Sequence, residues 1–189
     1  MTVKRWEIIS SKPNDSYGIF SFRTDRARSP RTGLTYDCYI LESTPWVNVI
    51  ALTPHEEVIL VRQYRHGIRD LTMEIPGGLV DAHDTPEAAA RRELREETGY
   101  QSDEWIPLGS VFPNPAIQNN RCYTFLARDV VYSGQQQLDE MEDIEVLYRP
   151  LKEIPDLIRG GEINHSLVLA AFFKYYLMQD THNLLILKI

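Results

Sequence analysis

Short extended segments dominate the first half of the chain, because its apolar residues either alternate with polar ones or come in brief continuous runs. Residues 35–42 (TYDCYILE) alternate, and residues 46–53 (WVNVIALT) are almost wholly apolar. Both are rich in aromatic and β-branched side chains, which is typical of strands. This pattern predicts strands at 5–10, 19–28, 35–42, 46–53, 58–65 and 71–76. Residues 12–18, which carry Pro, Asn, Asp, Ser and Gly, predict a loop.

A helix is predicted after the loop at 79–84. Thr85 is a suitable N-cap, Pro86 is favoured at the first helical position, and Glu87 places an acid in the first turn. Residues 88–98 (AAARRELREET) are mostly strong helix formers, and Gly99 follows where a C-terminal cap glycine belongs.

The second half adds strands near 106–112, 121–127 and 144–150, a short helix near 151–159 and a longer helix from about 165 to 179. The order is strands, one central helix, more strands and then helices. This order predicts an α+β fold, or an α/β sandwich with a mixed sheet, and excludes a doubly wound parallel sheet. The apolar tail at 184–189 fits either a last strand or a contact between subunits.

Charge and composition narrow the classes of function. The 189 residues carry a formal net charge of −7, which argues against a basic nucleic-acid-binding surface. The two cysteines, Cys38 and Cys122, form no zinc-type spacing. The most apolar helical run, 167–173, ends at Lys174 and is too short to span a bilayer, and the first ten residues lack the apolar core of a signal peptide. We therefore expect a cytoplasmic protein without a membrane or nucleic-acid partner.

Three glutamates of the predicted helix, Glu93, Glu96 and Glu97, are spaced so that they share one face. Such helices are often solvated faces with i,i+4 ion pairs. Here, however, a Gly77-Gly78 pair precedes the helix, and glycine permits close approach of the backbone to a ligand. Convergent carboxylates without nitrogen or sulfur ligands suit a hard cation, Mg²⁺ or Mn²⁺, and can hold more than one metal ion.

The stretch 78–100 resembles the Nudix box, G-x5-E-x7-R-E-U-x-E-E-x-G-U, in which U is aliphatic. Seven positions match without a gap: Gly78, Arg92, Glu93, Leu94, Glu96, Glu97 and Gly99. Asp84 stands where the box has Glu, and Tyr100 where it has an aliphatic residue. Asp84 keeps the charge that in the family pairs with the box arginine. The elements on either side also follow the family order, so the resemblance implies an α/β/α sandwich with a mixed sheet.

The resemblance implies a role for each matched residue. Glu93 and Glu97 would be metal ligands, Glu96 a third ligand or the base that orients water, and Arg92 the link between helix and loop. The backbone carbonyl of Gly77 would complete the metal shell. The implied reaction is hydrolysis of a nucleoside diphosphate linked to a group X, with water attacking one phosphorus in line.

Segments outside the box indicate X. Pro115, sixteen residues after Gly99, resembles the ADP-ribose pyrophosphatase and nucleotide-sugar branch of the family. Asn114, Asn119 and Asn120 cluster nearby and are followed by Arg121. Amide side chains supply donors and acceptors for sugar hydroxyls, although ordinary turn chemistry also explains the asparagines.

Two more features agree with this branch. Its members have a late acidic loop, and residues 138–143 (LDEMED) supply one, with Glu140 as the candidate base and Glu142 near the metal. A solvated run of charges is the alternative for this loop. Arg65, at the end of the strand 58–65, is the candidate for a bidentate grip on the diphosphate.

Residues 1–45 resemble the small N-terminal β-domain of the branch, which forms a homodimer and a nucleobase slot. Aromatic residues available for stacking are Phe20, Phe22, Tyr36 and Trp46, and core packing is the alternative role for each of them. Residues 46–180 would form the Nudix domain, and 181–189 an apolar tail.

The resemblance thus implies a Mg²⁺-dependent hydrolase that converts ADP-ribose or a nucleoside diphosphate sugar to a nucleoside monophosphate and a sugar phosphate. Two alternatives remain. One is a Nudix hydrolase of another substrate, such as a dinucleoside polyphosphate, NADH or an RNA 5′ end. The other is a Nudix module that binds a ligand without turnover.

Overall fold

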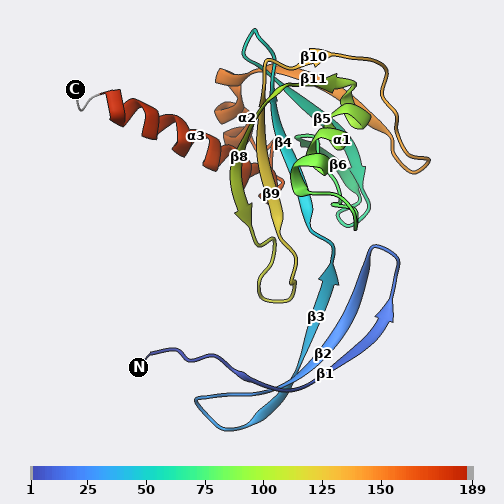
Figure 1. The fold of residues 1–189 in the computed structure, drawn as a ribbon, viewed down its shortest axis with the longest axis vertical. Coiled ribbons are helices and arrows are strands. Elements are labelled where there is room, and N and C mark those ends of the chain that lie inside the picture. Colours follow the sequence, from blue (N-terminus) through green and yellow to red (C-terminus); the bar gives the residue numbers. More distant parts are fainter. Residues whose placement is uncertain (1, 187–189) are drawn as a thin grey trace. The chain divides into compact units, whose positions relative to one another are not determined.

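A computed structural model describes the backbone of residues 2–186 and the side chains of residues 2–180 (Figure 1). The chain divides into two compact units. The first unit comprises Met1–Thr44 and Phe112–Arg121, and the second comprises Pro45–Val111 and Cys122–Ile189. Each unit has its own sheet.

The first unit is built on an antiparallel sheet of three strands, β1 (Glu7–Ser16), β2 (Phe20–Arg28) and β3 (Thr35–Ser43), in the order β1-β2-β3. The small N-terminal antiparallel sheet predicted from the sequence is therefore confirmed. β1 extends to Ser16, through part of the predicted loop at 12–18. Pro13 is tolerated because β1 is an edge strand and its pairing shifts register between Pro13 and Ser16.

The segment Phe112–Arg121 belongs to the first unit, although the sequence analysis placed it in the Nudix domain. It leaves the second unit between two paired strands and lies against the free edge of β3. Leu41 donates its backbone N–H to the carbonyl of Ile117 at 2.8 Å, and Leu41 and Gln118 form a parallel bridge. The two paired segments are far apart in the sequence, so the local sequence pattern did not predict their pairing.

The second unit contains a six-stranded mixed sheet with the path β11-β5-β4-β9-β8, and β6 pairs with β5. β4 and β9 are parallel, and the other neighbours are antiparallel. Its elements are β4 (Trp46–Leu52), β5 (Glu57–Arg65), β6 (Asp70–Glu74), α1 (Pro86–Thr98), β7 (Tyr100–Gln101), β8 (Glu104–Val111), β9 (Cys122–Arg128), β10 (Val131–Tyr132), β11 (Ile144–Pro150), the 3-10 turn η1 (Leu151–Glu153), α2 (Ile154–Gly160) and α3 (Ser166–Ile186).

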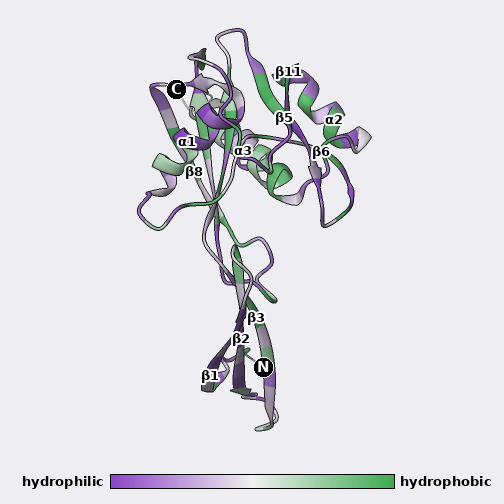
Figure 2. Cartoon of the chain, turned by 90° about the vertical axis from the view of Figure 1, so that its right-hand side faces the viewer, coloured by the Kyte–Doolittle hydropathy of each residue, from purple (hydrophilic) through white to green (hydrophobic). Residues whose placement is uncertain are grey.

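Helices cover both faces of this sheet. On one face, alternate β4 residues such as Val49 pack with Ala90 and Leu94 of α1. On the other, Ile50 packs with Ile154 of α2 and Phe172 of α3. In Figure 2, β5 is coloured as hydrophobic along its middle, whereas α1 is mostly hydrophilic. The predicted α+β class with a mixed sheet is confirmed.

Two details differ from the predicted elements. The short strands β7 and β10 pair with each other but are too brief to give a sequence pattern. α3 continues to Ile186 beyond the predicted end at 179, so residues 184–186 of the apolar tail are helical, while residues 187–189 lie outside the described residues. Within the described chain, no helix is both long and apolar enough to cross a membrane.

Candidate active site

The helix α1 begins and ends where the sequence predicts. The Thr85 side chain accepts a hydrogen bond from the Ala88 N–H at 3.1 Å, and Pro86 occupies the first turn. Gly99 has a φ of 76° and donates its N–H to the carbonyl of Arg95 at 2.8 Å. These caps fix the length of the helix and therefore the angular positions of its glutamates.

The three glutamates are not equivalent. Glu93 and Glu97 lie on the buried face beside Leu94, with 8% and 3% of their surface exposed. Glu96 lies at the edge of that face and is half-buried. The i,i+4 pair therefore places two carboxylates inside the protein, where an ion that lacks a compensating charge is costly.

A glycine segment runs alongside the beginning of β4 and faces these carboxylates. Val49 donates its N–H to the carbonyl of Pro76 at 2.8 Å, and Val47 donates to the carbonyl of Gly78 at 2.9 Å. Because alternate carbonyls of an extended segment point in opposite directions, the Gly77 carbonyl points away from β4. A Cβ at Gly77 would lie 2.2 Å from the Val47 oxygen, so the close pairing requires glycine.

The Gly77 N–H points to the same side as its carbonyl and donates to Oε2 of Glu97 at 2.9 Å. At the next residue, a Cβ on Gly78 would lie 2.5 Å from the carboxylate of Glu93. Both glycines are thus in contact with the two buried glutamates, and the Gly77 carbonyl lies on the glutamate side.

Arg92 connects the helix to the preceding loop, as its match to the box arginine implies. Its guanidinium donates to the Leu79 carbonyl at 3.0 Å and pairs with Asp84 at 3.4 Å. The same group donates to Glu93 at 2.9 Å and to Glu96 at 3.1 Å. The shorter Asp84 still reaches the arginine, although at the long end of hydrogen-bond distance.

Burial raises the pKa of both inner carboxylates. The pKa of Glu93 rises to about 7 and that of Glu97 to about 8, in each case chiefly because burial disfavours the charged form. The negative charge of Glu142 adds to both increases. A cation beside these carboxylates would favour their ionised forms.

The donor set fits a divalent, oxygen-liganded cation. The acidic groups are Glu93, Glu96, Glu97 and Glu142, and the Gly77 carbonyl supplies a neutral oxygen. Within the residues that the structure describes, no three His, Cys, Asp or Glu side chains already converge as a metal site. Arg92 donates to Glu93 and Glu96, and the Gly77 N–H donates to Glu97.

Arg65 ends β5 and pairs with Glu74, the last residue of β6. The two nitrogens Nε and Nη2 donate to the two carboxylate oxygens, both at 2.7 Å. Thr72 also donates its hydroxyl to this carboxylate. Arg62 is on the other face of the same strand and pairs with Glu145 of β11 at the surface.

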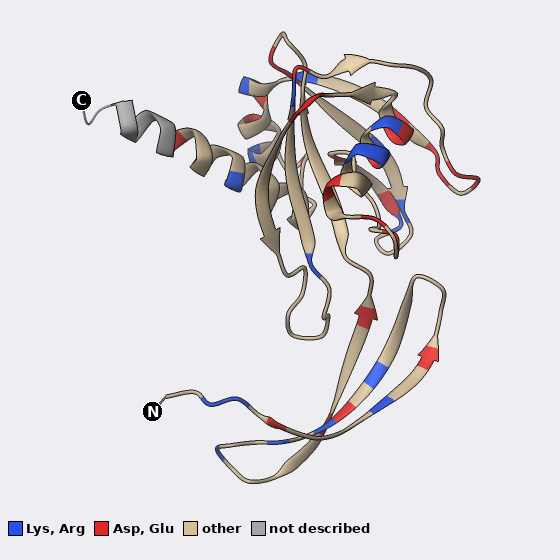
Figure 3. Cartoon of the chain, viewed as in Figure 1, with Lys and Arg blue, Asp and Glu red and all other residues tan. Residues whose placement is uncertain are grey.

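The acidic loop between β10 and β11 is attached to the end of α1. Gln137 donates its N–H to the Glu96 carbonyl at 2.8 Å. The Gln136 side chain donates to the carbonyls of Glu97 and Ile144, so it joins the helix end to the start of β11. Figure 3 shows this loop as a run of acidic residues near the charged α1.

The two candidate acids of the loop differ in their surroundings. Glu142 accepts a hydrogen bond from the Asp139 N–H at 3.0 Å, and its charge acts on Glu93 and Glu97. For Glu140, no hydrogen bond or ion pair to another described residue is recorded. Both side chains are exposed on the loop, and the charge of Glu142 contributes to the raised pKa of Glu93 and Glu97.

The predicted sugar-binding residues all lie in the first unit. Asn119 uses its amide there, because Nδ2 donates to Glu42 at 3.2 Å and Oδ1 accepts from the Ser43 N–H at 3.3 Å. Asn114 and Pro115 begin a turn closed by the Asn114 carbonyl, which accepts from Gln118 at 2.8 Å. The other candidate, Arg121, lies over the ring of Phe112 at 4.3 Å.

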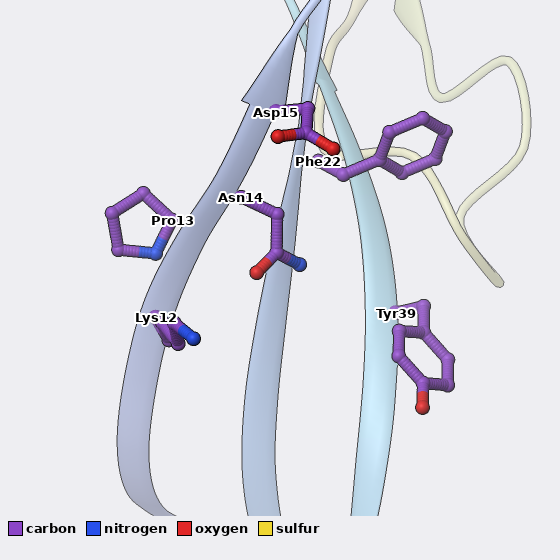
Figure 4. A pocket seen from close by; sticks show the side chains of 6 residues that line it. All are labelled: Lys12, Pro13, Asn14, Asp15, Phe22 and Tyr39. Carbon is purple, nitrogen blue, oxygen red and sulfur yellow. The ribbon is translucent and has the colours of Figure 1, made fainter.

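The first unit also contains a hollow of about 660 Å³ lined by residues of β1, β2 and β3. Figure 4 shows its aromatic and polar sides. Its lining residues are Lys12, Pro13, Asn14, Asp15, Phe22 and Tyr39.

Residue-by-residue reasoning missed Glu74, Thr72 and Gln136. The sequence feature that could have identified Glu74 is its position: it is the one charged residue of the predicted strand 71–76, three residues before the glycine pair. Thr72 and Glu74 are two apart and share a face of the strand. Nothing in the run 135–137 distinguishes Gln136 from an ordinary loop glutamine.

Comparison with known proteins decides the family. A family profile described as NUDIX domain matches residues 43–172. The chain belongs to the Nudix family. An ADP-ribose pyrophosphatase of Mycobacterium tuberculosis is 30% identical over 167 residues, which cover 87% of this chain and 80% of that protein. A GDP-mannose pyrophosphatase of Citrobacter koseri is 34% identical over 119 residues, or 57% of this chain and 60% of that protein.

A solved structure described as an ADP compounds hydrolase has the same fold. It matches with a TM-score of 0.83, covers 96% of this chain and 98% of its own, and is 19% identical. The predicted resemblance to Nudix hydrolases of the ADP-ribose pyrophosphatase branch is confirmed.

Proposed function

We propose that this Nudix protein hydrolyses the pyrophosphate bond of ADP-ribose or of a nucleoside diphosphate sugar, and releases a nucleoside monophosphate and a sugar phosphate. The observation that carries the proposal is the pair of buried carboxylates, Glu93 and Glu97, held against Gly77 and Gly78. The relatives named for ADP-ribose and GDP-mannose support the substrate class.

The reaction needs a divalent cation, for which we propose Mg²⁺, with Mn²⁺ as a substitute. Glu93, Glu97 and the Gly77 carbonyl would hold it, with Glu96 and Glu142 at its edge. When bound, the cation supplies charge that offsets the negative phosphates and favours attack by water. It also explains why an acidic cleft attracts an anionic substrate, since the carboxylates alone repel it.

The chain's own residues divide the remaining work. Arg92 keeps α1 in place against the loop that contains Asp84. Arg65 is available to bind the diphosphate, because its guanidinium is partly exposed. For the base that accepts a proton from the attacking water, Glu96 and the loop acids Glu140 and Glu142 are the candidates. Glu142 is favoured over Glu140 by its electrostatic proximity to Glu93 and Glu97.

We assign the nucleobase slot and a homodimer contact to the first unit. Its exposed aromatic side chains include Trp6, which packs on Tyr36 at 5.9 Å, and Phe22, which meets Phe20 at 5.9 Å. Such rings stack on bases and bury well between subunits. Of the loop residues, Asn114, Pro115 and Arg121 remain candidates for substrate contact, while Asn119 anchors the loop to β3.

A turnover assay tests the activity. Purified protein with Mg²⁺ is offered ADP-ribose, GDP-mannose, UDP-glucose, ADP-glucose, NADH and a dinucleoside polyphosphate, and products are identified by mass spectrometry. We expect cleavage of one or two nucleotide sugars to a nucleoside monophosphate. Cleavage of NADH or the polyphosphate alone would select the other hydrolase function, and tight binding without cleavage would indicate a sensing module.

The matched variants are Glu97→Gln and Glu87→Gln on the same helix. Glu97 is buried at the site, whereas Glu87 is an exposed first-turn residue paired with Arg91. Glu97→Gln is expected to lower kcat/KM by at least about 100-fold, because even indirect partners of metal ligands contribute 10- to 100-fold. Glu87→Gln should retain wild-type activity. Equal activity of the two variants would refute the metal assignment.

The dimer is tested separately by light scattering after size-exclusion chromatography. A mass of twice 21.9 kDa is expected for the wild type. A monomer at all concentrations would leave the hydrolase proposal intact and remove the dimer.

A further inference from the structure

The two partners of the Arg65–Glu74 ion pair differ strongly in how much of each side chain is exposed to solvent. The Glu74 side chain is 5% exposed, whereas 43% of the Arg65 side chain is accessible. A surface arginine paired with a surface acid contributes little and moves freely. Here the acid is fixed inside the sheet and the arginine extends from it toward solvent.

Strand pairing explains how the pair forms. β5 and β6 are antiparallel with Arg65 opposite Asp70, Gln63 opposite Thr72 and Val61 opposite Glu74. Side chains two apart share a face, so Arg65, Thr72 and Glu74 lie on the same face of the two strands. The Arg65 side chain extends back along β5, past Thr72 of the neighbouring β6, to reach Glu74.

Two neighbours hold Glu74 in its ionised form. Burial by itself would raise the pKa of its carboxyl, but the hydrogen bonds and charge of Arg65, with a smaller contribution from the Thr72 hydroxyl, lower the pKa below its usual value. The carboxylate is therefore a fixed acceptor with two occupied oxygens.

The contacts leave one edge of the guanidinium available. Nε and Nη2 are the donors to Glu74. Arginine has five N–H donors in a planar fork, so two on Nη1 and one on Nη2 remain. One N–H from each of these nitrogens forms the Nη1–Nη2 edge, which matches a phosphate. Glu74, which holds the guanidinium, lies three residues before Gly77, and the Gly77 N–H donates to Glu97. Arg65 is therefore anchored to the segment that contacts the box carboxylates.

We propose that Glu74 is a positioning residue: together with Thr72 it fixes the Arg65 guanidinium so that the Nη1–Nη2 edge receives the diphosphate of the substrate. The inference rests on the proposed pyrophosphohydrolase function and deepens it. A side chain ordered in advance loses less conformational entropy on binding, so the effect appears in substrate affinity.

The test compares two glutamates that pair with arginines of the same strand. Glu74→Gln removes the anchor of Arg65, and Glu145→Gln removes the surface partner of Arg62. Kinetics are measured with Mg²⁺ and whichever nucleotide sugar the wild type cleaves. We expect Glu74→Gln to raise KM by about 10- to 100-fold, the range of a hydrogen bond to a charged group, with kcat changed by less than about 3-fold. Glu145→Gln should leave both constants unchanged.

A double variant separates positioning from a general loss of structure. Arg65→Lys alone should raise KM to a similar extent, and Glu74→Gln added to Arg65→Lys should raise it no further, because both changes remove one interaction. An unchanged KM in Glu74→Gln, a fall in kcat without a change in KM, or effects that multiply in the double variant would overturn the inference.

If Glu74→Gln does not fold, Thr72→Val tests the inference instead. This variant keeps the ion pair and removes one hydrogen bond to the carboxylate. A KM about 3-fold higher supports positioning, in line with one neutral-donor hydrogen bond, and an unchanged KM refutes it. If the wild type cleaves nothing, calorimetry with ADP-ribose replaces kinetics. Weaker binding by the variant then supports positioning while the hydrolase proposal fails; equal binding, or none by the wild type, refutes both.

Discussion

The six-stranded sheet of the second unit is covered by helices on both faces, whereas the three strands of the first unit bury little. Among the described residues of β1–β3, Asp25 and Ala27 are buried. Charged pairs such as Arg28 with Glu7 hold the first sheet at its surface, where they contribute little to stability. The second unit can thus support a precise site, while the first unit offers exposed aromatic surface for contacts with other molecules.

The largest expected difference between the units is in stability. Leu94 of α1 is fully buried against the sheet, and Phe22 of β2 is partly exposed. Leu94→Ala should lower the free energy of unfolding by about 2–5 kcal/mol, because it leaves a cavity in the core. Phe22→Ala should lower it by less than about 1 kcal/mol. Urea titration followed by circular dichroism measures both, and comparable losses would contradict the contrast.

The site itself can be disturbed without touching the core. Gly78→Ala places a Cβ 2.5 Å from the Glu93 carboxylate, whereas a Cβ on Gly67 has no neighbour within 4 Å. We expect Gly78→Ala to lower kcat/KM by about 10- to 100-fold, since it displaces Glu93, the proposed metal ligand, by an amount comparable to the loss of a supporting contact. Gly67→Ala is the control and should match the wild type. Full activity of Gly78→Ala would show that Glu93 need not occupy this position.

The buried carboxylates predict a dependence of stability on pH in the metal-free protein. Because burial raises the pKa of Glu93 to about 7 and of Glu97 to about 8, the folded state keeps protons that the unfolded state releases above its ordinary value of 4.5. The stability contributed by these protons is present below pH 4.5 and is lost as the pH rises toward 8.

The Tm in EDTA should therefore fall between pH 5.5 and pH 8.5, by at least about 4 °C, a shift that corresponds to roughly 1–2 kcal/mol in a chain of this size. Mg²⁺ should raise the Tm more at pH 8.5 than at pH 5.5, because cations and protons compete for the same oxygens. In Glu97→Gln the decline should be shallower. A steeper decline in that variant would assign the effect to other groups.

The smallest effect is expected in the first unit. Asn119→Ala removes two hydrogen bonds to β3 and should cost about 1 kcal/mol of stability. KM should change by less than about 3-fold, in contrast to Arg65→Lys. A larger rise in KM would show that Asn119 contacts the substrate instead of serving only as an anchor.

Local signals determined much of this protein. The caps at Thr85 and Gly99 fixed α1, and the spacing of the glutamates fixed which carboxylates share its inner face. Alternation in β3 and short apolar runs in β4 and β5, rich in β-branched and aromatic residues, located these strands. The Nudix box identifies the family from the sequence alone, because its residues lie within one continuous segment.

Only the tertiary structure decided the partners of residues far apart in the chain. It joined the loop at 112–121 to β3 and attached Gln136 to the end of α1. It also paired Arg65 with the buried Glu74. Helix caps and side-chain spacing are properties of neighbours in sequence, so the chain displays them directly. Pairings across strands depend on register and burial, which arise only when the sheet forms and one face is removed from water.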